Sequence, residues 1–167
     1  MAGRAAGLVA VCTVALSACA GGRDTAEVAP TQHRTVVVND DPTPLCVAVA
    51  QTVAQKVNAL GNRPSIPPKE GMAFPYAEAA ARTFTMKETS FPLDIVWVGP
   101  GSLVVGSTLM VPLSKDLYRS PAPITLAVEL SPQDWGPLAG TARSLSLGQA
   151  CDGTVTAGRP GQPQTRF

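Results

Sequence analysis

The fold of this chain is centred on the stretch Leu93-Asp94-Ile95-Val96-Trp97-Val98-Gly99-Pro100-Gly101-Ser102. Its first six residues are apolar apart from Asp94, which is typical of a strand that is buried on both faces. The next four are glycine, proline and serine, which favour turns. Because the apolar segment 103–111 follows directly, this stretch predicts a β-hairpin at the centre of the fold.

Short strand patterns continue on both sides of this hairpin. Residues 46–50 and 72–74 fit extended structure, and residues 82–88 and 124–130 alternate apolar with polar side chains. Serine followed by proline opens a short helix at Ser131. The pattern of about six to eight strands, with two short helices and no alternation of strand and helix, predicts a mainly β fold, a small compact β-barrel or sandwich.

The other short helix is predicted after Thr52, because Gln55 stands three residues further on and can complete a capping box. A glycine at position 61 would end this helix. We expect its apolar stripe to lie on the sheet. The stripe consists of Val53, Val57 and Leu60.

The N-terminus has the pattern of a lipoprotein signal. Arg4 is followed by an apolar run from Ala5 and then by Leu16-Ser17-Ala18-Cys19, in which small residues precede the cysteine. Cleavage before Cys19 would leave its thiol for diacylglycerol, usually with a further acyl group such as palmitate. The alternative is an ordinary secretory signal in which Cys19 is incidental. A transmembrane helix is disfavoured, because only about 14 apolar or small residues precede Cys19 whereas ~20 are needed.

The sequence predicts four segments. Residues 1–18 are the signal peptide, residues 19–43 are the lipidated cysteine and a flexible tether, residues 44–152 form a single β-rich domain, and residues 153–167 form a disordered tail. A tether of this length spans on the order of 25 to 30 Å and would lift the domain clear of the lipid headgroups. Within the tether, the apolar run at 36–38 has the alternative of being an edge strand.

The charge balance limits the partners. Removal of residues 1–18 removes one basic residue, Arg4, from the 13 in the chain and leaves 12 basic against 12 acidic residues. A neutral chain does not favour nucleic acid or an electrostatic grip on anionic lipid, which need clustered Lys and Arg. The expected contact with the membrane is therefore the lipid anchor, in an extracytoplasmic location.

The cysteines agree with export. Cys12 leaves with the signal and Cys19 is the lipidation site, so Cys46 and Cys151 remain as an even pair that predicts a disulfide. Two buried free thiols or a metal-binding pair are the alternatives. The chain contains one histidine, His33, which does not complete a zinc-like ligand set, and we expect no metal site.

One group of polar residues could carry chemistry. If Thr89 to Pro92 form a four-residue loop, an antiparallel pairing of 82–88 with 93–98 places Lys87 opposite Asp94. One interpretation is a ligand cleft with Lys87, Glu88 and Asp94 on its floor. The other is a structural pair that fixes the hairpin, because a buried carboxylate needs a partner.

Other catalytic arrangements have little support in the sequence. No histidine outside the predicted tether is available for a Ser-His-Asp triad, and no glycine-rich phosphate loop precedes a helix. The sequence therefore implies no cofactor.

Four segments resemble the family catalogued as domain of unknown function 192. They are Gly71-Met72-Ala73-Phe74, Phe84-Thr85-Met86-Lys87-Glu88-Thr89, Pro92-Leu93-Asp94-Ile95 and Val128-Glu129-Leu130. The resemblance covers about Leu45 to Asp152 and implies a small β-rich domain, exported or lipid-anchored, with no settled activity. Family members commonly have Trp at the position of Thr85, Asn at that of Glu88, and Gly-Asp at that of Gly148-Gln149. The positions that do match are the candidate site residues: Phe84, Met86, Lys87, Thr89, Pro92, Leu93 and Asp94.

These observations lead to one functional hypothesis and one alternative. The hypothesis is a membrane-anchored lipoprotein of the bacterial cell envelope, a non-enzymatic binding or structural module whose partner is an envelope protein or a small ligand. The alternative is an envelope hydrolase or transferase in which Asp94 or Glu88 acts as base and Lys87 stabilises negative charge.

Overall fold

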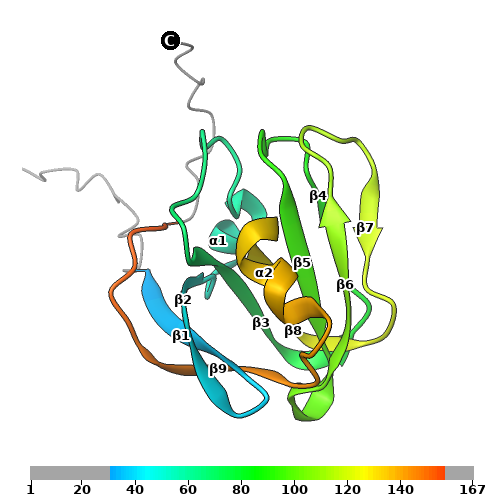
Figure 1. Cartoon of the computed structure of the whole chain (residues 1–167). Helices are drawn as coiled ribbons and strands as arrows, with labels where there is room; N and C mark the ends of the chain where they lie inside the picture. Colours follow the sequence, from blue (N-terminus) through cyan, green and yellow to red (C-terminus); the bar gives the residue numbers. More distant parts are fainter. Residues whose placement is uncertain (1–30, 157–167) are drawn as a thin grey trace, which may run out of the picture.

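The computed structural model describes residues 31–156. This part of the chain contains nine strands, two α-helices and one 3₁₀ helix, η1, so the predicted mainly β fold with two short helices is confirmed (Figure 1). The signal peptide and Cys19 lie outside the described residues. In chain order the elements are β1 (Gln32–Val38), β2 (Asp41–Val49), α1 (Val53–Asn58), β3 (Glu70–Ala80), β4 (Thr83–Thr85), β5 (Leu93–Val98), η1 (Pro100–Ser102), β6 (Val104–Met110), β7 (Leu117–Arg119), β8 (Ile124–Leu130), α2 (Pro132–Ala139) and β9 (Leu145–Ala150).

Seven of these strands form one mixed sheet. Their order is β6-β5-β8-β3-β2-β1-β9, while β4 and β7 form a separate two-stranded sheet. The large sheet is not closed into a barrel, so that form of the prediction is wrong. Strands β2 and β3 are parallel and are joined through α1, a strand-helix-strand unit. The sequence pattern predicted the helix but not the parallel pairing of the strands that flank it.

The predicted central hairpin is present. Strands β5 and β6 pair antiparallel with Leu93 opposite Met110, and η1 makes the connection. Gly101 and Ser102 have φ angles of 68° and 64°, a left-handed conformation that glycine adopts without strain. Strand β5 pairs on its other side with β8 and is buried on both faces, as its apolar sequence predicts.

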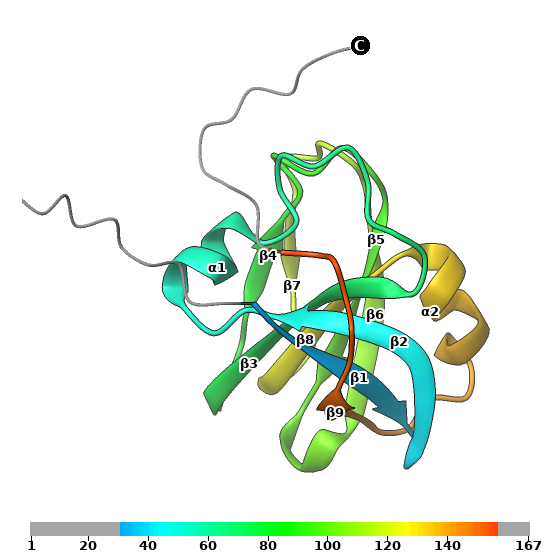
Figure 2. The ribbon, with the colours of Figure 1, turned by 90° about the vertical axis from the view of Figure 1, so that its left-hand side faces the viewer.

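The sheet has an apolar core on each face. Residues of β5 and β8 alternate between the two cores, so that Val96 and Val128 belong to one and Trp97 and Ala127 to the other. Helix α2 covers the first core with Trp135, whereas α1 and the residues after it cover the second (Figure 2). The two helices therefore lie on opposite faces of the sheet.

Helix α1 has its predicted N-terminal cap, but its valines face solvent instead of the sheet. Thr52 and Gln55 form the capping box, with the Gln55 amide donating to Thr52 Oγ1 at 3.1 Å. The side chain of Gln55 is buried, whereas Val53 and Val57 are 79% and 76% exposed. The prediction that these valines lie on the sheet is wrong. The interior contact is made instead by Leu60, beyond the end of the helix.

The domain begins earlier than predicted. Residues 32–38 form β1, which lies between β2 and β9 in the sheet, so they are neither a tether nor an edge strand. Val36 is fully buried and Val38 nearly so, and burial of these side chains is what holds the segment in the sheet. The boundary predicted at residue 44 therefore moves to Gln32.

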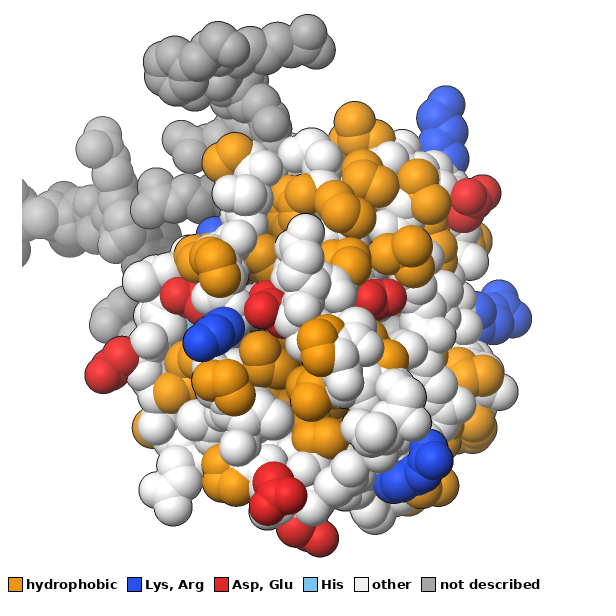
Figure 3. Space-filling view, viewed as in Figure 1, with side chains coloured by type: hydrophobic (Ala, Val, Ile, Leu, Met, Phe, Trp, Pro, Cys, Tyr) orange, Lys and Arg blue, Asp and Glu red, His pale blue; other side chains and the backbone are white. Residues whose placement is uncertain are grey.

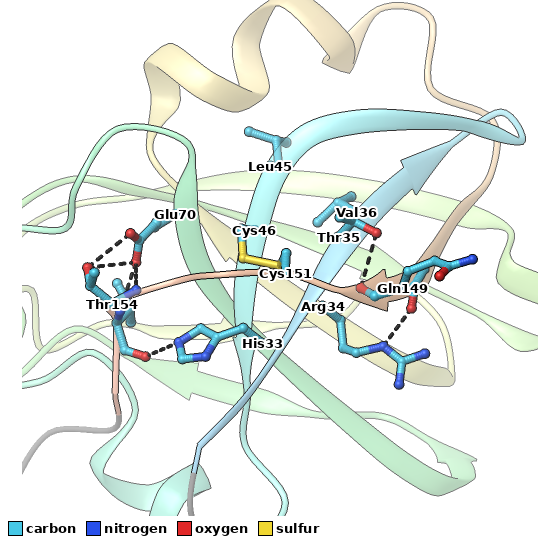
Figure 4. The surroundings of a disulfide bond; sticks show 12 residues. His33, Arg34, Thr35, Val36, Leu45, Cys46, Glu70, Gln149, Cys151 and Thr154 are labelled. Carbon is cyan, nitrogen blue, oxygen red and sulfur yellow. Dashed lines mark hydrogen bonds between the residues drawn. A yellow bond between two sulfur atoms is a disulfide. The ribbon is translucent and has the colours of Figure 1, made fainter.

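The domain also ends later than predicted, because residues 153–156 are held against the fold rather than disordered. Figure 4 shows Cys46 of β2 joined to Cys151 by a disulfide, with the Glu70 carboxylate beyond it. That carboxylate accepts hydrogen bonds from the amides of Thr154 and Val155 at 2.8 and 2.7 Å. The remainder of the predicted tail, 157–167, lies outside the described residues.

The same four-residue end contacts β1. His33 Nε2 donates to the carbonyl of Val155 at 2.6 Å, and the Val155 side chain is fully buried in the core on the α1 face. The first and last described residues therefore leave the domain close together, beside α1 (Figure 2).

Candidate functional site

The predicted pairing of 82–88 with 93–98 does not form, because each segment has another partner. Strand β4 pairs with β7, which places Phe84 opposite Tyr118. In β5, Asp94 lies opposite Leu109 on one side and Leu130 on the other. The predicted register of Lys87 opposite Asp94 is therefore wrong.

Phe84 and Met86 are packing residues of the core on the α1 face. The Phe84 ring makes edge-to-face contacts with Phe74 and Trp97, at centroid distances of 5.1 and 5.5 Å. Met86 is fully buried in the same core. The contact between Phe84 and Trp97 joins the small sheet to the large one.

The loop that contains Lys87, Glu88 and Thr89 is fixed to a neighbouring loop. Glu88 accepts hydrogen bonds from Asn62, through its carbonyl at 2.7 Å and its Oε2 at 3.0 Å. Thr89 is buried, and its carbonyl accepts from the amide of Leu113 at 2.9 Å. Lys87 is exposed. Glu88 and Thr89 therefore hold this loop against neighbouring segments, whereas Lys87 faces solvent.

Leu93 and Asp94 point to opposite faces of β5. Leu93 is fully buried in the core on the α1 face, whereas Asp94 is half-buried on the face that α2 covers. Burial raises the pKa of the Asp94 carboxyl. Pro92, directly before them, is exposed at the entry to the strand. The seven candidate residues are therefore divided between core, loop and surface, and they do not surround one cleft.

The residue with the most unusual environment is Glu129, which the sequence analysis did not single out. It lies on β8 between Met72 of β3 and Ile95 of β5 and is only 3% exposed. Its Oε2 is buried and has no hydrogen-bond partner among the described residues. Burial raises the pKa of Glu129 to about 8, so the carboxyl is protonated and neutral at pH 7.

The alternation in 124–130 concealed Glu129, because the pattern assigns Thr125, Ala127 and Glu129 to a solvent face. Both faces of β8 are instead covered. The burial of Glu129 follows from the central position of β8 in a sheet covered on both faces, which the alternation of its residues does not indicate.

Three exposed apolar side chains lie at the end of β6 and directly after it. Leu109 lies opposite Asp94 near the end of β6, and Val111 and Leu113 follow just after the strand ends at Met110. Leu109, Val111 and Leu113 are 58%, 56% and 60% exposed, and we call these three residues the β6 apolar surface. Hydrophobic side chains gather in the upper part of the face shown in Figure 3. Where exposed apolar side chains gather on one face, that face is typical of an interaction site.

Two further observations concern the described residues. No group of three or more His, Cys, Asp and Glu side chains within 31–156 is placed to hold a metal ion. Over the same range, no helix has the length and apolar character required to cross a bilayer.

Comparison with known proteins supports the fold and the family. The fold matches the crystal structure of a "putative transcription regulator" from Sinorhizobium meliloti 1021, with a TM-score of 0.62 and 22% identity over 71% of this chain and 94% of that one. It also matches a protein of unknown function from Novosphingobium aromaticivorans DSM 12444, with a TM-score of 0.60 and 23% identity over 71% of this chain and 85% of that one. No curated protein matches the chain.

The family model carries the assignment, because it matches more than half of the chain. It covers residues 35–136, which span β1 to α2 and include both the β6 apolar surface and Glu129. The chain therefore belongs to the DUF192 family, described as uncharacterized.

Proposed function

We propose that this protein is a lipoprotein of the bacterial cell envelope that is anchored through Cys19 and binds an envelope partner without acting as an enzyme. The observation that carries the proposal is the combination of Leu16-Ser17-Ala18-Cys19 with the disulfide between Cys46 and Cys151. The first is the pattern at which lipoprotein signals are cut, and disulfides persist in oxidising compartments outside the cytoplasm.

The arrangement of the polar residues supports a binding module over a hydrolase or transferase. An acid-base mechanism needs its groups within hydrogen-bond reach of one substrate. Here Glu88 is bonded to Asn62, Lys87 is exposed on a loop, and Asp94 belongs to the opposite face of the sheet from Phe84 and Met86. The β6 apolar surface beside Asp94 supplies the binding face of the proposed module.

The anchor predicts a change of location when Cys19 is replaced. Cys19→Ser removes the thiol that receives the acyl chains, and no helix within residues 31–156 is long and apolar enough to cross a bilayer. The full chain should therefore move from the membrane fraction to the soluble fraction. The measurement is fractionation and immunoblotting of cells that produce each form. Cys12→Ser is the matched control and should leave the protein in the membrane. Retention of the Cys19→Ser protein on membranes would refute the anchor.

The binding face predicts the loss of a specific partner. Leu109→Asp with Val111→Asp places two charges on the β6 apolar surface and should abolish in-cell cross-linking to the protein that the wild type captures, because an apolar contact cannot desolvate them. Leu117→Asp is the control, since Leu117 is 70% exposed but lies on β7 in the small sheet. Reproducible catalytic turnover that Lys87→Ala and Asp94→Asn both abolish would instead support the enzyme.

A further inference from the structure

Helix α1 presents its apolar side chains to solvent. Val53 and Val57 are four residues apart, on the same side of the helix, and are 79% and 76% exposed. The opposite side of the helix buries Gln55, whose Oε1 accepts from the amides of Gln51 and Thr52 at 2.7 and 3.0 Å. This hydrogen bonding fixes the helix with its valines outward, so the two valines form an apolar surface that the fold itself does not cover.

This surface lies at the end of the domain where the N-terminal segment arrives. Gln32, at the start of β1, pairs with Val49 at the end of β2, only four residues before α1 begins. Figure 2 shows the start of β1 beside α1. Because the domain begins at Gln32 rather than at residue 44, only residues 20–31 separate it from Cys19. Even at full extension, twelve residues span at most about 40 Å, which limits how far α1 can lie from the lipid surface.

Two basic side chains lie over the ring of Tyr76, and one of them, Lys56, belongs to α1. Lys56 Nζ lies 4.4 Å and Arg82 Cζ 4.0 Å from the centroid of the Tyr76 ring, so both cations contact the same ring beside α1. The mature chain is formally neutral, and this pair is therefore a local feature rather than a basic face. Lys56 Nζ also donates to the carbonyl of Pro75 at 2.5 Å, and the Arg82 guanidinium donates to the carbonyl of Glu78 at 3.1 Å. Each cation has further N–H donors, and their charge is complementary to the phosphates of lipid headgroups.

We infer that α1 docks on the bilayer that holds the acyl chains of Cys19, with Val53 and Val57 entering the headgroup boundary and with Lys56 and Arg82 at the phosphates. This inference rests on the proposed lipid anchor. The acyl chains supply the attachment, and α1 sets the orientation. Because α2 lies on the opposite face of the sheet, this orientation turns the β6 apolar surface away from the membrane.

The test uses an added tryptophan as a depth probe. The native Trp97 and Trp135 are 0% and 1% exposed, so lipid does not reach them. The full lipidated chain with Val57→Trp is reconstituted into vesicles of phosphatidylcholine and phosphatidylglycerol, with and without brominated acyl chains. Bromine should quench the added emission by roughly half, as expected for a side chain buried ~5–10 Å below the headgroup boundary. Leu109→Trp, on the opposite face, is the matched control and should not be quenched.

A second change and the retained fraction separate the possible outcomes. Val53→Asp combined with Val57→Trp should abolish the quenching while the acyl chains keep the protein on the vesicles. If the Val57→Trp protein stays on the vesicles and its added emission is not quenched, the docking is overturned and the anchor remains. The same holds if the emission is blue-shifted but not quenched, because a second copy or another segment then covers the helix. Failure of the lipidated chain to associate with the vesicles would overturn the anchor itself.

Discussion

Glu129→Gln is expected to remove most of the pH dependence of this protein's stability between about pH 5 and 9. In the folded protein the pKa of Glu129 is raised from 4.5 to about 8 by burial, whereas in the unfolded chain the carboxyl ionises at its ordinary value. Between these values the unfolded state binds fewer protons than the folded state, so the free energy of unfolding of the wild type falls as pH rises and levels off above about pH 8.

Between pH 5 and 9 the free energy of unfolding of the wild type should fall by an amount on the order of 3 to 5 kcal/mol, because each unit of pKa difference corresponds to about 1.4 kcal/mol. Urea unfolding of wild type and Glu129→Gln at pH 5, 7 and 9 measures it. The variant should lose far less stability with pH, because the amide of Gln does not titrate. Exposed Glu88→Gln is the control and should follow the wild type. Parallel pH profiles for wild type and Glu129→Gln would show that the carboxyl is not buried as described.

The second large effect is expected from the disulfide. Cys46→Ala with Cys151→Ala should lower the free energy of unfolding by about 4 to 5 kcal/mol, because the bond closes a loop with a sequence separation of 105 in the unfolded chain. Loss of the disulfide should also weaken nearby native contacts. The disulfide holds the C-terminal segment in place, and Val155 of this segment forms hydrogen bonds with Glu70 and His33. Denaturant unfolding of the two forms measures the difference.

Reduction supplies the control for this effect. Dithiothreitol should bring the wild type down to the stability of the double variant and leave the double variant unchanged. If the wild type is insensitive to reduction and both thiols can be alkylated without it, the two cysteines are not paired in the protein. The hydrogen bonds from Thr154 and Val155 to Glu70 would then be the main contacts that keep residues 153–156 on the domain.

Local features of the sequence predicted local features of the structure. The turn residues after β5 specify the hairpin directly, and the capping box of Thr52 and Gln55 forms as expected because cap and partner lie within one helical turn. The cysteine pair and the mainly β class were also predictable. The turn and the capping box depend on residues that are close together in the sequence. The cysteine pair and the fold class follow from counting cysteines and strand patterns.

Pairing over long distances in the chain was not predictable in the same way. Phe84 pairs with Tyr118 rather than with the next strand, because residues 86–92 leave β4 for a loop that bonds to Asn62. Asp94 therefore lies opposite Leu109 and Leu130, and the predicted structural pair of Lys87 and Asp94 does not form. The outward turn of α1 and the burial of Glu129 likewise depend on what covers each face of the sheet, which alternation within one segment does not reveal.

The measurement that tests the lipid anchor most directly is metabolic labelling with a clickable palmitate analogue. Cells that produce the full chain are labelled, the protein is purified by a C-terminal tag, and the label is detected on a denaturing gel. The account predicts a labelled wild type, a labelled Cys12→Ser control and an unlabelled Cys19→Ser variant. A wild-type chain that carries no label would contradict the anchor, and with it the proposed docking of α1 on the membrane.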